Sequence, residues 1–227
     1  MVRYLRAAYL FCVRPSFRST TINRFFHGQH YFQEEILTKE NRYPVLFKLC
    51  HQLLANMKTL QILSYGCATG EEVKSLGAYF PEAEIQGVDI NKWCVDTCIK
   101  KIKGPHFRFF HRFSREFELC GPFDAIFCLA VFQHTSNRTN SLNSVSTRIT
   151  FSGFCSELCN LDKKLNVGGL LIIDHSDFNF MSTDIAKNYL PVDVEGNKIV
   201  RNRPNFNSQN MKICETSSFF RIFRKIN

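Results

Sequence analysis

The sequence predicts an α/β fold in which helices cover both faces of a mostly parallel sheet. From residue 60 onward, short apolar segments alternate with segments of helical periodicity, which is the order of elements in parallel sheets. Residues 123–132 are apolar almost throughout, as expected of a strand buried on both faces. Two strand-like segments with no helix between them, 211–215 and 218–225, follow later in the chain. They predict a hairpin that adds an antiparallel edge to the sheet.

Residues 1–59 show helical patterns without strand-like alternation, and they predict a helical extension that caps the domain formed by residues 60–227. Pro44 suits the first turn of a helix over residues 44–54. Residues 1–14 are basic and carry no acid, so a mitochondrial transit peptide and a basic surface helix are alternatives to a cap.

Within the domain, apolar runs that end at glycine, proline or polar residues predict strands, and longer amphipathic segments predict helices. Glu71 and Glu72 open the first of these helices, where the helix dipole favours negative charge. Residues 135–148 and 176–210 are polar and are predicted to be irregular. The strands are expected at 60–65, 84–91, 107–110, 123–132 and 167–174, and the helices at 70–80, 92–103 and 149–165.

The formal net charge is +9, and the positive excess lies at the two ends of the sequence. Residues 1–33 hold five arginines and no acid, and residues 198–227 hold seven bases and one acid. Such ends can attract nucleic acid, an anionic substrate or a membrane surface, but solvated ends of a basic protein explain them equally well. No apolar run approaches the roughly 20 residues of a membrane-spanning helix.

The ten cysteines include no Cys-x-x-Cys pair, and no histidine follows them at zinc-finger spacing. Several of them, such as Cys67 and Cys128, stand in apolar runs, where cysteine acts as a small apolar residue. We therefore predict reduced thiols, no metal site and a cytoplasmic location.

A turn bracketed by Gly66 and Gly70 follows the first strand of the domain. Glycines allow a tight turn and a close approach to a ligand, and the first amides of the next helix point into the same gap. A turn at the carboxyl end of a strand is the usual ligand crevice of such a sheet, although a plain connection is the alternative. The spacing is not the Gly-x-Gly-x-x-Gly of dinucleotide sites, and no phosphate-binding loop occurs, so a nucleoside without phosphates fits better.

Asp89 ends the second predicted strand, 19 residues after Gly70. An acid at this place can accept hydrogen bonds from both hydroxyl groups of a ribose. The alternative is a purely structural role as the N-cap of the helix over 92–103.

Four segments in this order resemble the class I S-adenosylmethionine-dependent methyltransferases over about residues 60–225. The segments are 62–70, 87–91, 123–132 and 168–173. The resemblance implies a Rossmann-like, seven-stranded and mostly parallel sheet with an antiparallel C-terminal edge strand, in three layers of helix, sheet and helix. It also implies that the cofactor is S-adenosyl-L-methionine.

The resemblance assigns cofactor contacts residue by residue. Most members of the family carry an acid where this chain has Ser64, and the first motif is instead similar to that of the chemotaxis-receptor glutamate methyltransferases. In those enzymes the acid after the second glycine binds the amino group of the cofactor, which implies this role for Glu71, helped by Ser64 and Thr69. The remaining implied contacts are the backbone amides of Ala68–Gly70 for the cofactor carboxylate, Asp89 for the ribose, Ile90 for the adenine, and Leu129 and Ala130 for the methyl group. Gly66, in the same turn, is also an implied cofactor contact.

Methyl transfer is an in-line displacement in which the protein supplies positioning and in some cases a base. Candidates for the base follow the fourth and fifth strands of the domain. His134 follows the fourth strand, and the unperturbed pKa of histidine lies close to neutrality. Asp174 and His175 end the fifth strand.

The sequence leaves alternatives to methyl transfer. They are a nicotinamide-dependent oxidoreductase, which the missing dinucleotide motif disfavours, and a non-catalytic member that binds the cofactor or a partner. Nucleic acid as the acceptor is disfavoured, because no Asn/Asp-Pro-Pro-Tyr/Phe motif follows residues 123–132. A small-molecule acceptor is expected, and its identity and the oligomeric state stay open.

Overall fold

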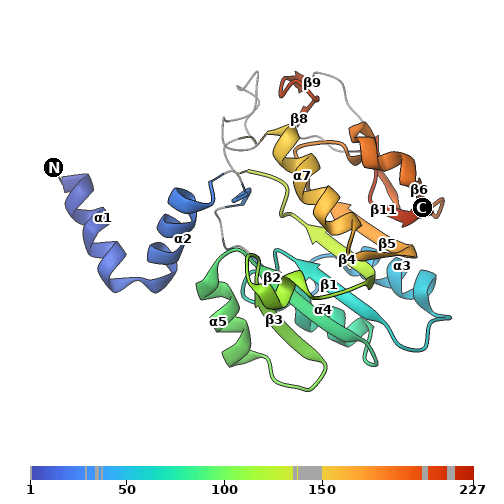
Figure 1. Ribbon diagram of the computed structural model, residues 1–227, viewed down its shortest axis with the longest axis horizontal. Coiled ribbons are helices and arrows are strands. Elements are labelled where there is room, and N and C mark those ends of the chain that lie inside the picture. Colours follow the sequence, from blue (N-terminus) through green and yellow to red (C-terminus); the bar gives the residue numbers. More distant parts are fainter. Residues whose placement is uncertain are drawn as a thin grey trace.

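The protein is built around one sheet of seven strands in the order β3-β2-β1-β4-β5-β11-β6 (Figure 1). The computed structural model describes residues 2–28, 30–33, 36, 38–134, 137, 150–200, 204–213 and 218–227. The strands β3, β2, β1, β4 and β5 are parallel to their neighbours, and β11 is antiparallel to both β5 and β6. This confirms the predicted seven-stranded mixed sheet. Its strands are β1 (Gln61–Tyr65), β2 (Glu84–Asp89), β3 (Phe107–His111), β4 (Phe123–Leu129), β5 (Leu165–Asp174), β6 (Tyr189–Pro191) and β11 (Ile222–Lys225).

The predicted hairpin of residues 211–215 and 218–225 is wrong. β9 (Lys212–Ile213) pairs with β8 (Asn205–Phe206), and β10 (Ser218–Phe220) pairs with β7 (Lys198–Val200), both outside the main sheet. The sheet instead takes its remaining strand from β6, within the segment predicted to be irregular. β6 has three residues and ends in a proline, which an outer strand tolerates, so it carries no alternation that a sequence pattern could reveal.

Helices cover both faces of the sheet and confirm the three layers. α3 (Pro44–Leu54), α4 (Glu71–Tyr79) and α5 (Lys92–Lys101) contribute to one buried cluster, and α6 (Arg115–Glu118) and α7 (Phe151–Asp162) to the other. The strands divide their side chains between the two clusters by alternation, as a period of two requires. In β4, Ala125, Phe127 and Leu129 belong to the first cluster, and Ile126 and Cys128 to the second. Phe123 departs from this alternation and joins the second cluster, because the pairing of β4 with β5 shifts register between Phe123 and Ala125.

The N-terminal region forms two helices, α1 (Val2–Val13) and α2 (Pro15–Phe26). α2 lies against the start of α5, where the hydroxyl of Ser19 donates a hydrogen bond to Oδ1 of Asn91 at 2.6 Å. α1 projects beyond α2, away from the sheet (Figure 1). None of the helices in the described ranges has the length and apolar character that a membrane crossing requires.

Candidate functional site

A pocket lies at the carboxyl ends of β1, β2 and β4. Six of the residues predicted to contact a cofactor line it: Gly66, Ala68, Asp89, Ile90, Leu129 and Ala130. The opposite wall comes from the segment between α2 and α3, which contributes residues between His30 and Tyr43. The sheet therefore brings together residues that lie far apart in the sequence, and the N-terminal segment lies over them.

The turn after β1 holds its backbone in the left-handed region, which is unfavourable for residues other than glycine. Ala68 has φ of +48° and Ala130, at the end of β4, has φ of +62°. Residues other than glycine seldom occupy this left-handed region, and such strain gathers at functional sites. Gly66 has φ of +78°, and a Cβ there would lie 2.6 Å from Cγ2 of Val131, so this glycine lets the turn pack against the chain that follows β4.

Asp89 connects the turn after β1 to the start of α5. Its Oδ2 accepts a hydrogen bond from the backbone N–H of Ala68 at 2.8 Å, and its Oδ1 accepts one from the N–H of Asn91 at 2.7 Å. The N-cap of α5 is Asn91, whose side chain accepts from the N–H of Trp93. The alternative of Asp89 as that cap is thus wrong. Burial raises the pKa of Asp89 to about 6, although both backbone N–H groups oppose the shift.

The two adjacent acids of α4 have different surroundings. Glu72 lines the pocket, and its Oε1 accepts a hydrogen bond from the hydroxyl of Ser64 at 2.7 Å. Burial raises the pKa of Glu72 to about 8, against the opposing effects of the Ser64 hydroxyl and the charge of Arg42. Glu71 does not line the pocket, and its Oε2 accepts from the hydroxyl of Thr69 at 2.7 Å. Ser64, predicted to assist Glu71, thus contacts Glu72 instead.

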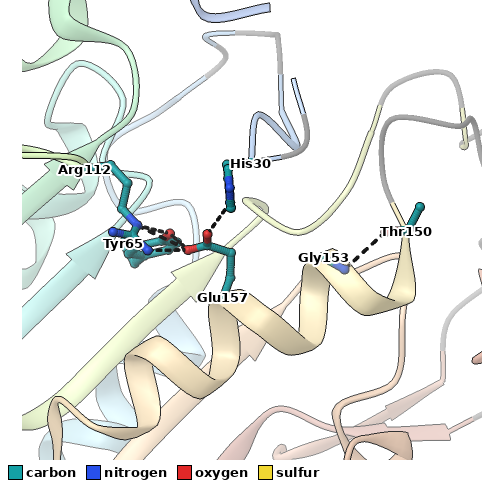
Figure 2. A network of polar contacts seen from close by, with 6 residues as sticks. All are labelled: His30, Tyr65, Arg112, Thr150, Gly153 and Glu157. Atoms are coloured by element: carbon teal, nitrogen blue, oxygen red, sulfur yellow. Dashed lines mark hydrogen bonds and ion pairs between the residues drawn. The ribbon is translucent and has the colours of Figure 1, made fainter. Parts of the chain in front are cut away.

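A buried polar network joins the N-terminal segment to the sheet and to α7 (Figure 2). Glu157 of α7 is 1% exposed. Its Oε2 accepts hydrogen bonds from the hydroxyl of Tyr65 and from Nη2 of Arg112, the latter at 2.9 Å, and its Oε1 lies 2.7 Å from Nδ1 of His30. Tyr65, Arg112 and His30 all line the pocket.

This network was not predicted, although the sequence holds a signal for it. Glu157 stands on the apolar stripe of α7, beside Phe154, Leu158 and Leu161, all of which are buried. An acid at such a position needs a buried partner, because an unpaired charge in a core is costly.

The predicted bases lie outside the pocket. The backbone N–H of His134 donates to Oδ2 of Asp177 at 2.9 Å. Asp174 is 2% exposed, and its Oδ2 lies 3.4 Å from Nη1 of Arg221. His175 follows with φ of +53°, its Nδ1 3.1 Å from Oδ1 of Asp174. Their roles as bases stay predictions. Most of the predicted loop over 135–148 lies outside the described residues.

One family model matches part of the chain. Residues 62–150 match the family model described as a methyltransferase domain, which confirms the resemblance carried by the sequence motifs. No curated protein matches the chain.

Three solved structures are similar to this chain at low sequence identity. The plantazolicin methyltransferase BpumL in complex with SAH is 17% identical, with 74% of this chain and 56% of that chain covered and a TM-score of 0.42. PKMT2 from Rickettsia typhi is 22% identical, with 58% and 24% covered and a TM-score of 0.41. A putative caffeoyl-CoA O-methyltransferase from Staphylococcus aureus is 17% identical, with 75% and 73% covered and a TM-score of 0.41. The chain spans about half the length of BpumL, at 56%.

Proposed function

We propose that this chain, which carries a class I S-adenosylmethionine-dependent methyltransferase domain, transfers a methyl group from S-adenosylmethionine to a small-molecule acceptor. One observation carries the proposal. A single pocket holds a buried carboxyl group, an arginine and a second acid, on Glu72, Arg42 and Asp89. These groups match an amino-acid zwitterion and a ribose.

The amino-acid end of the cofactor fits beside β1 and α4. Glu72 is a buried carboxyl group whose raised pKa means that its charge is poorly compensated in the free protein. A bound ammonium group would supply the missing positive charge. Arg42 and the backbone N–H groups at the start of α4 suit the carboxylate. We therefore assign the ammonium contact to Glu72, positioned by Ser64, in place of Glu71.

The nucleoside end fits between β2 and β4. Asp89 retains free lone pairs after accepting two backbone N–H groups, so its carboxylate can accept from ribose hydroxyls. Ile90 offers an apolar surface to the adenine. Leu129 and Ala130, at the end of β4, would border the methyl group.

The cofactor supplies the activated methyl group, and the chain positions it and excludes water. Together with the sheet, described residues between His30 and Tyr43 enclose the pocket. This enclosure favours an acceptor small enough to enter it. All nine cysteines in the described ranges are free thiols, which supports a location in a reducing compartment such as the cytoplasm.

Calorimetry with S-adenosylhomocysteine tests the proposed function. We expect the wild-type protein to bind S-adenosylhomocysteine and not NADH, because the turn after β1 lacks a pyrophosphate cradle. Binding of NADH without binding of S-adenosylhomocysteine would establish the oxidoreductase alternative instead.

A further inference from the structure

His30 is the one histidine among the residues that line the pocket. Its Nδ1 lies 2.7 Å from Oε1 of Glu157, and its side chain is 39% exposed, whereas that of Glu157 is 1% exposed. Nε2 of His30 has no hydrogen-bond partner in the described part of the chain. Glu157 thus holds one ring nitrogen, and the other belongs to a side chain that lines the pocket and has no protein partner in the described ranges.

The partners of Glu157 determine which ring nitrogen of His30 carries the proton. Nη2 of Arg112 lies 2.9 Å from Oε2, so Glu157 is the carboxylate partner of an ion pair. An ionised carboxylate only accepts hydrogen bonds, so the bond at Oε1 must be donated by Nδ1–H of His30. In the neutral imidazole, the lone pair then resides on Nε2, which is the arrangement that a general base requires.

We propose that His30, held by Glu157, is the general base of the reaction, and that the acceptor is a phenol-type hydroxyl group. This proposal rests on the proposed methyl transfer. The acceptor oxygen attacks the methyl carbon as the bond between that carbon and the sulfonium breaks, and the electron pair of the broken bond returns to sulfur. The hydroxyl proton passes to Nε2 of His30, and Glu157 stabilises the resulting imidazolium.

The lining of the pocket supports an aromatic acceptor. Beside His30, the N-terminal segment contributes the rings of Tyr31, Phe32 and Tyr43 to the lining, and Tyr65 lines it from the end of β1. Aromatic side chains favour planar apolar ligands through stacked and edge-to-face contacts. A neutral phenol needs a base to become a strong nucleophile, which is the service that His30 would provide.

A tautomer measurement tests the base without any acceptor. Long-range proton–nitrogen NMR spectra of the full chain with bound S-adenosylhomocysteine report which nitrogen of neutral His30 carries hydrogen. We expect the Nδ1–H form, and the spectrum of His30→Gln identifies the signal. His106 serves as the internal control, because its Nδ1 lies 3.0 Å from Glu84 in an exposed pair outside the pocket. An Nε2–H form of His30 would overturn the proposal.

Methylation of two simple probes tests the acceptor class and the proton transfer. Phenol is protonated at pH 8, whereas 4-nitrophenol is largely ionised and needs no base. With labelled S-adenosylmethionine, we expect His30→Gln to slow the methylation of phenol by about 100-fold or more and that of 4-nitrophenol by far less. His106→Gln should leave both rates unchanged. The glutamine can still donate to Glu157, so the N-terminal segment keeps its anchor.

Each outcome of this experiment decides one part of the proposal. Equal losses with both probes would make His30 a structural residue, and no methylation of either probe by the wild-type protein would overturn the acceptor class. Failure of the wild-type protein to bind S-adenosylhomocysteine would instead refute the proposed methyl transfer, whichever tautomer His30 adopts.

Discussion

At the scale of single residues, the surroundings of Glu72 make a prediction about pH. Its pKa is raised by burial from 4.5 to about 8, so below that pH the free protein holds Glu72 protonated. An ammonium group favours the ionised form, and binding at lower pH must therefore release a proton. The affinity for S-adenosylhomocysteine should rise between pH 6 and 8, by up to about 100-fold across two pH units.

The neighbouring acid provides the matched control for this prediction. In calorimetric titrations, Glu72→Gln should weaken the binding of S-adenosylhomocysteine and flatten the pH dependence of its affinity between pH 7 and 8. Glu71→Gln should leave the affinity and its pH dependence unchanged. Asp89, whose pKa is raised to about 6 by burial, adds to the pH dependence of the affinity only near pH 6. The reverse pattern, with the loss at Glu71, would restore the assignment made from the sequence.

Asp89→Ala tests the ribose contact at the same scale. The change removes the acceptor for the N–H of Ala68 as well as the contact with the ribose, so S-adenosylhomocysteine should bind more weakly by about 1–3 kcal/mol. Asp96→Ala is the control, since Asp96 is a half-buried residue of α5 that pairs with Lys92 and does not line the pocket. If the two variants bind the ligand equally well, Asp89 has no contact with it.

At the scale of elements, the turn between β1 and α4 owes its shape to packing against the chain after β4. Gly66→Ala adds a methyl group 2.6 Å from Val131 and also strains a backbone with φ of +78°. We expect the free energy of unfolding to fall by about 2–4 kcal/mol, measured by urea denaturation.

Gly168 separates the two causes of that loss. It has a similar φ of +84°, but no atom lies within 4 Å of the position of an added Cβ. Gly168→Ala should therefore show the backbone cost alone, about 1–2 kcal/mol. Equal losses in the two variants would mean that contact with Val131 contributes nothing.

At the scale of the whole molecule, sequence patterns predict the long strands and the turn beside the pocket. They do not predict short strands or the side-chain contacts that individual residues make. The continuous apolar run of β4 and the glycine turn after β1 predict the sheet and the position of the pocket. By contrast, the three-residue β6 has no pattern, and a rotation of one residue along α4 decides that Glu72 rather than Glu71 reaches the pocket. The pair of His30 and Glu157 spans 127 positions, beyond the reach of local periodicity.

The position of the pocket also predicts which backbone amides a bound cofactor protects from hydrogen exchange. The sheet and described residues between His30 and Tyr43 both line the pocket, so a bound cofactor should hold the sheet and this segment together. Hydrogen exchange with and without S-adenosylhomocysteine measures this coupling. Amides in residues 38–43 should become more protected along with those in 66–70. The exposed helix α1 should exchange at the same rate in both states and serves as the control. Protection confined to 66–70 would mean that the N-terminal segment lies over the site without closing on its ligand.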